Sequence, residues 1–126
     1  MHEVEITNKE GNVFQVKVRD NQFVIEPLSE RLSPGEALLA SLGACIGLFT
    51  RRYLDNAKIQ GQGFSIRVSS EFTEEKPFRF SQIKVLLDLN NIQLEPSRKE
   101  ALLKFVENCP IHNTLKGNPV IAIELK

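Results

Sequence analysis

Apolar and polar residues alternate along the first quarter of the chain, which predicts short β-strands with one buried face. Phe14, Val16 and Val18 are apolar and the residues between them are polar, the period-two pattern of a half-buried strand. Residues 4–6 and 23–25 predict a further strand on each side, and two turn-forming pairs separate the three: Gly11-Asn12 and Asp20-Asn21. We therefore expect an antiparallel three-stranded meander within residues 1–27.

The pattern then changes to helical spacing, and residues 33–56 predict a long helix. Ser33 is the expected N-cap, Pro34 the first helical residue, and Glu36 completes a capping box. Apolar residues recur with helical period: Leu38, Leu42, Cys45 or Ile46, Phe49 and Tyr53. Small residues such as Gly43 and Gly47 make the helix thin, so another segment can approach it closely. We expect this helix to be central and buried.

Alternation resumes in residues 63–90, which predict a pair of strands. The apolar phase shifts between Phe80 and Ile83, which indicates a bulge. A second helix is expected over residues 97–109, starting near Ser97 with a second capping box. A short helical turn over 109–117 should end at Gly117, and residues 119–126 predict a last strand.

Strands and helices are partly segregated in this order, which is typical of an α+β fold with mainly antiparallel sheet. The 126 residues fit a single domain spanning 1–126. A helix as apolar as the first one, in so short a chain, indicates that a second protomer completes the core.

Charge and hydropathy narrow the class of protein. Sixteen basic and sixteen acidic residues give a net charge of zero, so we expect neither a nucleic-acid partner nor an anionic membrane. The longest mainly apolar stretch, Leu38 to Phe49, is shorter than the roughly 20 residues of a membrane span. The N-terminus lacks an apolar signal core. We therefore expect a soluble, cytoplasmic protein.

The two cysteines are the candidate reactive groups. Cys45 lies on the apolar stripe of the first helix, where a free cysteine is either a small buried hydrophobe or a reactive thiol. Cys109 directly precedes Pro110. As the N-cap of a helical turn its thiolate would be stabilised by free backbone N–H groups, and the alternative is a buried residue closing the second helix. His112 is either a proton carrier for a thiol or a polar surface residue.

A metal site is not expected from these residues. Cys45, Cys109 and His112 supply three donors, and His2 is remote in the sequence. A structural zinc site needs four closely placed donors.

Two segments, taken together, resemble the OsmC/Ohr family (osmotically inducible protein C and organic hydroperoxide resistance protein). Residues 33–45, SPGEALLASLGAC, are similar to the family's first-cysteine helix, and residues 109–115, CPIHNTL, to its second-cysteine motif. The order of strands and helices matches over nearly the whole chain. The resemblance implies an intertwined homodimer with antiparallel sheets, swapped strands and buried central helices.

The resemblance also implies thiol peroxidase chemistry. Cys45 would attack the terminal oxygen of a hydroperoxide and become a sulfenic acid. Cys109 would condense with it to a disulfide, and a thiol or dithiol reductant would restore both thiols. No metal, haem or flavin is implied, so no cofactor is expected. The apolar residues around Cys45 favour organic hydroperoxides over hydrogen peroxide.

The sequence departs from the family pattern in the charges expected near Cys45. Gly35 stands where the family has a glutamate, and the acid follows at Glu36. At about 100° per residue, Glu36 and Cys45 lie on opposite helix faces. Glu36 is therefore a tentative catalytic residue or only a helix cap. Arg19 and Arg31 lie outside the family's arginine motif, and Arg52, on the same face as Cys45, is expected to be a charge at the exposed helix end.

A second hypothesis uses the same fold without catalysis. The protein would hold a small apolar molecule in the dimer cleft, or sense oxidation through its thiols. A third, RNA binding, is disfavoured because the neutral chain lacks a GXXG loop at residues 61–63 and 116–119.

Overall fold

The computed structural model describes residues 2–59 and 63–126. They form two compact units, one up to Ala40 and one from Ser41 to Lys126.

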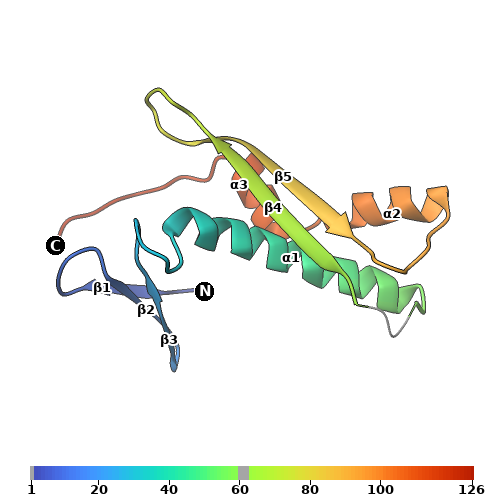
Figure 1. The fold of residues 1–126 in the computed structure, drawn as a ribbon, viewed down its shortest axis with the longest axis horizontal. Coiled ribbons are helices and arrows are strands. Elements are labelled where there is room, and N and C mark those ends of the chain that lie inside the picture. The colour runs from blue at the N-terminus through green and yellow to red at the C-terminus, as the bar shows by residue number, and fades with distance from the viewer. Residues whose placement is uncertain (1, 60–62) are drawn as a thin grey trace. The chain divides into compact units, whose positions relative to one another are not determined.

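The first unit contains a three-stranded antiparallel sheet. Its strands are β1 (Glu5–Asn8), β2 (Phe14–Val18) and β3 (Asn21–Ile25), in the order β1-β2-β3. Val16, the central residue of β2, pairs with Ile6 on one side and Phe23 on the other, and its side chain is buried. The predicted meander is confirmed (Figure 1).

Helix α1 (Pro34–Asn56) begins where its capping residues predict. The Glu36 backbone N–H donates to Ser33 Oγ at 3.1 Å, and the Ser33 N–H donates to Glu36 Oε1 at 3.0 Å. The two bonds satisfy donors that a helix start leaves unpaired. The predicted capping box and helix are confirmed.

A hairpin of two long strands forms the sheet of the second unit. Strands β4 (Ser65–Phe72) and β5 (Phe80–Asp88) pair antiparallel. Glu71 pairs with Gln82 but Phe72 pairs with Phe80, so Ser81 is the extra residue of a bulge. The phase shift seen in the sequence at this point is therefore a real irregularity of the ladder.

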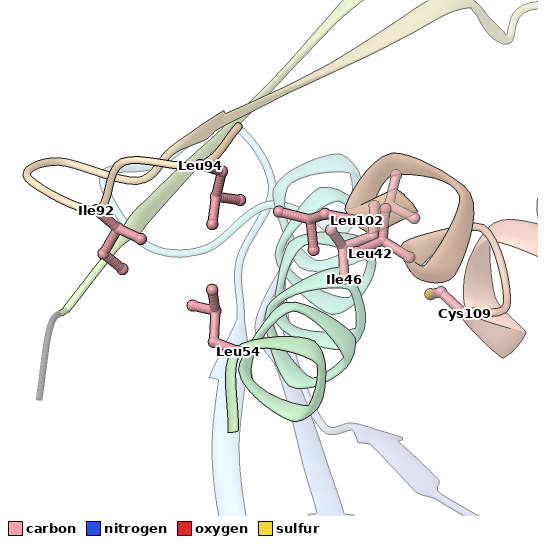
Figure 2. Close-up of a cluster of buried hydrophobic side chains, with 8 residues drawn as sticks. Leu42, Ile46, Leu54, Ile92, Leu94, Leu102 and Cys109 are labelled. Carbon is pink, nitrogen blue, oxygen red and sulfur yellow. The ribbon is translucent and has the colours of Figure 1, made fainter. Parts of the chain in front are cut away.

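The core of the second unit lies between α1, the hairpin and the segment after it. Helix α1 passes alongside β4 (Figure 1), and a Cβ added at Gly43 would lie 3.0 Å from Val68 Cγ2. The absence of a side chain at Gly43 therefore lets β4 approach α1 closely at this point. The buried cluster consists of Cys109 and of apolar residues from α1, the β5–α2 loop and α2 (Figure 2). These residues are Leu42, Ile46, Leu54, Ile92, Leu94, Leu102 and Val106.

The buried face of α1 differs from the predicted stripe. Its fully buried positions fall at every fourth residue: Leu42, Ile46, Thr50 and Leu54. Phe49 and Tyr53 are only half-buried, because they lie at the edge of this face. The burial of Thr50 was not predicted because its side chain is polar. Its hydroxyl donates to the Ile46 carbonyl oxygen at 2.9 Å, which satisfies it inside the core.

The second helix starts earlier and ends earlier than predicted. Helix α2 spans Pro96–Val106, and Glu95 is its N-cap without a side-chain capping bond. The expected capping box at Ser97 is therefore wrong, because Pro96 already has the backbone angle of a first helical residue. Helix α3 (Pro110–Lys116) follows and ends at Gly117, as predicted.

The predicted strand over residues 119–126 is not formed. The segment has no regular secondary structure, and four of its apolar side chains are at least 80% exposed: Val120, Ile121, Ile123 and Leu125. A strand needs a neighbouring strand for its hydrogen bonds, and the described part of this single chain provides none for this segment.

The apolar character of α1 extends beyond the stretch Leu38 to Phe49, so the expectation that no segment is long enough to span a membrane is wrong by length and composition. By length and composition it could cross a membrane, since its best 18-residue window has a mean hydropathy of 1.2. Buried core helices also meet this criterion, and α1 contributes three side chains to the apolar core cluster.

Candidate functional site

Cys45 lies in the middle of α1, next to the buried residue Ile46. Its side chain is half-buried and packs against the apolar core cluster, and its thiol is free. The predicted position on the apolar stripe is correct. Cys45 is therefore the less buried of the two cysteines.

Cys109 lies between α2 and α3 and is fully buried. Its side chain extends from the chain toward α1 (Figure 2). It is the N-cap of α3, because Cys109 Sγ accepts the His112 backbone N–H at 3.4 Å. The two sequence interpretations of Cys109, a capping residue and a buried residue, are therefore both correct.

The fold brings the two thiols together, although 63 residues separate them in the sequence. Burial raises the pKa of the Cys109 thiol, and a side-chain hydrogen bond with Cys45 raises it further. The backbone N–H groups of His112 and Ile111 act in the opposite direction without overcoming these effects. The predicted stabilisation of a Cys109 thiolate by the helix start is thus outweighed by burial and by Cys45.

This arrangement distinguishes the chemistry available to each thiol. Cys109 is held as a protonated thiol in contact with Cys45, and it is shielded from solvent. Cys45 is the less buried of the two residues. A group attached to Cys45 by an external reagent would therefore form beside a second thiol that could displace it.

An aromatic cluster that the sequence did not single out flanks the same part of α1. The Phe105 ring lies 5.8 Å from the Phe49 ring and 5.9 Å from the Tyr53 ring, centroid to centroid. The Tyr53 hydroxyl donates to the Arg98 carbonyl oxygen at 3.3 Å. These rings join α1 to α2 over the two turns that follow Cys45, and the Arg52 guanidinium carbon lies 5.2 Å from the Phe49 ring centroid. The helical spacing of Phe105 on α2 was the available signal, but it did not identify its partners.

His112 contacts the Cys109 thiol through its backbone N–H and not through its ring. Its N–H faces Cys109, whereas ring Nδ1 lies 3.2 Å from Asn113 Oδ1. Its role as a proton carrier stays a prediction.

The remaining charged candidates lie in the first unit. Glu36 forms the cap described above, and its hydrogen bonds with Ser33 lower the pKa of its carboxyl. Arg19 adopts a left-handed backbone conformation (φ 54°) in the turn between β2 and β3, and Arg31 is an exposed loop residue. A catalytic role for Glu36 stays a prediction.

Among the described residues, the two cysteines belong neither to a cluster of metal ligands nor to the apolar cavity beside α2. In the described ranges, 2–59 and 63–126, no three His, Cys, Asp or Glu side chains cluster as metal ligands would. An open cavity of about 490 Å³ lies between the end of β5 and α2 and is lined mainly by leucines: Leu86, Leu87, Leu89, Leu102 and Leu103.

Comparison with known proteins identifies relatives of this chain. The family model described as OsmC-like protein matches residues 27–124. No curated protein matches the chain. The OsmC-like protein from Mycoplasma pneumoniae superposes with a TM-score of 0.78 at 19% identity, covering 93% of this chain and 88% of that one.

Two further similar structures are of proteins named for hydroperoxide resistance. The organic hydroperoxide resistance protein from Elizabethkingia anophelis has a TM-score of 0.71 at 15% identity, covering 94% of this chain and 91% of that one. The organic hydroperoxide resistance protein OsmC from Legionella pneumophila has a TM-score of 0.64 at 21% identity, covering 94% and 92%. At these identities the similarity establishes the α+β fold.

Proposed function

Because the chain belongs to the OsmC-like protein family, we propose that it is a thiol-dependent peroxidase that reduces organic hydroperoxides. One observation carries the proposal: the half-buried Cys45 thiol is hydrogen-bonded to the fully buried Cys109 thiol. A peroxidase of this kind needs an accessible sulfur that is oxidised first and a second thiol within reach. The names of the two hydroperoxide resistance proteins of the same fold are consistent with it.

In the first step, the Cys45 thiolate attacks the terminal oxygen of the hydroperoxide. The S–O bond forms as the O–O bond breaks, and the alkoxide leaves with a proton as an alcohol. Cys45 is then a sulfenic acid, oxidised by two electrons.

In the second step, Cys109 resolves the sulfenic acid. Its sulfur attacks Cys45 Sγ, the hydroxyl leaves as water with the Cys109 proton, and a Cys45–Cys109 disulfide forms. A thiol or dithiol reductant then reduces the disulfide by thiol–disulfide exchange, and the reductant supplies the two electrons. Because burial and Cys45 raise the pKa of the Cys109 thiol, Cys109 enters this step as the protonated partner.

The surroundings of Cys45 support an organic hydroperoxide as the substrate. Phe49 lies one turn after Cys45 on α1, and its ring packs against Phe105, which also contacts Tyr53. Such a surface gains free energy by contact with an alkyl or aryl group, which hydrogen peroxide lacks.

We also propose that the working form is a cytoplasmic homodimer. The support is the exposed apolar side chains of residues 119–126, which need a strand neighbour that the described part of one chain does not supply. A second copy with swapped strands would cover them.

Mass spectrometry of three proteins tests the reaction. Wild type, Cys45→Ser and Cys109→Ser are treated with one equivalent of cumene hydroperoxide, and intact mass and free thiols are measured. We expect wild type to lose two hydrogens, Cys109→Ser to accumulate a sulfenic acid that dimedone traps, and Cys45→Ser to stay unchanged. Turnover with added dithiol completes the test.

Unreacted wild-type thiols under conditions that oxidise a known thiol peroxidase would refute the proposal. The alternative, a non-catalytic small-molecule-binding or redox-sensing protein, would then apply. If peroxide oxidises wild type once but no dithiol supports turnover, a redox-sensing protein would be favoured.

A further inference from the structure

The cavity between the end of β5 and α2 combines apolar walls with one positively charged side chain. We propose that it binds a small amphiphilic carboxylate, with the alkyl chain of the ligand against the leucines and its carboxylate at Lys99. Both cysteines lie outside the lining. The site is therefore independent of any reaction at the thiols.

The cavity has the size and lining of a small-molecule site. Its volume of about 490 Å³ falls within the roughly 300–1,000 Å³ of ligand pockets. Of the eight described residues that line it, six are leucine or isoleucine, and the other two are Asp88 and Lys99. An alkyl chain gains free energy on such a surface because apolar area is removed from water.

Two leucines form the rim of the cavity. Leu86 of β5 is 56% exposed and Leu103 of α2 is 59% exposed, whereas the neighbouring Leu102 is buried in the core. These two side chains are the most exposed apolar residues of the lining. A chain that enters the cavity would cover both of them, and substitution of either leaves the core intact.

The turn after β5 forms one wall of the cavity without a ligand. Asp88 Oδ1 accepts the Asn90 backbone N–H at 2.8 Å, which is an Asx turn. The Ile92 N–H then donates to the Leu89 carbonyl oxygen at 3.0 Å, and the Ile92 side chain is buried (Figure 2). A preformed wall costs little ordering entropy when a ligand binds.

The charges of the lining favour an anion as the polar end of the ligand. In the ranges 2–59 and 63–126, no carboxylate oxygen lies within 4 Å of the Lys99 ammonium nitrogen. Asp88 already accepts a hydrogen bond in its turn, and Glu100 pairs with Lys104 at 3.8 Å. The unfilled partner is therefore the ammonium group, which a carboxylate can satisfy by a charge-assisted hydrogen bond.

Titration with decanoate tests the site. Backbone amide NMR signals of the ¹⁵N-labelled protein are followed as decanoate, decan-1-ol or decyltrimethylammonium is added, each below its micelle concentration. We expect decanoate to shift signals from the end of β5, the following turn and α2. It should bind about threefold more tightly than decan-1-ol, because only decanoate pairs with Lys99. The cationic probe should bind more weakly than either.

Variants separate the charge from the apolar walls. Lys99→Met should abolish the preference for decanoate over decan-1-ol without changing the affinity for decan-1-ol, and Lys99→Arg should retain the preference. Lys104→Met is the matched control, because Lys104 lies on the same helix outside the lining. Leu103→Ser should weaken the binding of both probes about fivefold. Circular dichroism and thermal melting check the fold of each variant.

Equal affinity of wild type for decanoate and decan-1-ol, or shifts confined to other parts of the protein, would overturn the proposal. If wild type binds none of the probes and Leu103→Ser dissociates a homodimer, the cavity is a contact between two copies and the proposal is wrong. Decanoate should bind Cys45→Ser as it binds wild type. Failure of the peroxidase and failure of this site are thereby distinguished.

Discussion

The Cys109 thiol is fully buried and hydrogen-bonded to the Cys45 side chain, and both features raise its pKa. The folded protein therefore binds the Cys109 proton more tightly than the unfolded chain does. The contribution of this group to stability is fully present below the pKa of an unfolded cysteine, about 8.5. It is lost as the pH rises through the folded value.

This difference predicts how stability depends on pH. Under reducing conditions, the free energy of unfolding should fall as the pH rises above about 8.5, and it should fall less steeply in Cys109→Val, which has no proton to lose there. Urea unfolding of both proteins at several pH values measures the two slopes. Parallel slopes would mean that Cys109 does not titrate abnormally in the folded state.

The close approach of Gly43 to Val68 predicts that a larger residue will overpack the contact between α1 and β4. A Cβ at position 43 already lies 3.0 Å from Val68 Cγ2. We expect Gly43→Leu to destabilise the protein by about 1–3 kcal/mol, and Val68→Ala in the same chain to restore part of the loss. Urea unfolding of the single and double variants checks this, and strictly additive effects would contradict a direct clash.

The burial of Leu42 predicts a large effect of a charge at this position. Its side chain is 4% exposed within the apolar cluster, so an aspartate there would have no solvent or partner. We expect Leu42→Asp to cost at least about 3 kcal/mol and to abolish soluble dimer. Leu103→Asp, at a position 59% exposed, is the control for adding a charge to a helix. A cooperatively folded Leu42→Asp dimer would disprove the central position of α1.

The capping box predicts that Ser33 and Glu36 act on the stability of α1. Ser33→Ala should cost about 1 kcal/mol. Hydrogen bonds with Ser33 lower the pKa of the Glu36 carboxyl. The contribution of Glu36 to folding stability is therefore present at pH values above the pKa of an unfolded glutamate. It is lost as the pH falls through the folded value.

Peroxide kinetics separate the cap from catalysis at Glu36. We expect Glu36→Ala to lower the melting temperature at pH 7 while the rate of Cys45 oxidation stays within about twofold of wild type. Ser33→Ala is the matched control, because it disrupts the same cap without removing a charge. A large loss of oxidation rate confined to Glu36→Ala would instead establish the tentative catalytic role.

The exposed C-terminal segment predicts that residues 119–126 contribute to assembly. We expect wild type to sediment as a dimer, and a chain ending at Asn118 to dissociate or aggregate, because the swapped strand would be missing. Replacement of Ile121 and Ile123 by serine tests the apolar contribution at unchanged length. A truncated chain with unaltered dimer affinity would exclude a structural role for this segment.

Local features of the fold were predictable from sequence because short-range rules determine them. The meander, the capping box at Ser33, the bulge near Phe80 and the end of α3 at Gly117 each depend on a few neighbouring residues. The strand over 119–126 failed as a prediction for the same reason. Its alternation was visible, but a strand also needs a partner, and alternation says nothing about where the partner comes from.

The amino-acid sequence alone determined the elements, the α+β class and the two cysteine motifs, because periodicity and capping are properties of contiguous residues. Only the tertiary structure brought Cys45 into contact with Cys109 and showed that burial outweighs the helix start in setting the Cys109 pKa. It also placed the Arg52 guanidinium over the Phe49 ring. It placed the Phe105 ring of α2 against the Tyr53 ring of α1. These relationships depend on which faces of α1 and α2 meet, and packing across long stretches of chain decides that.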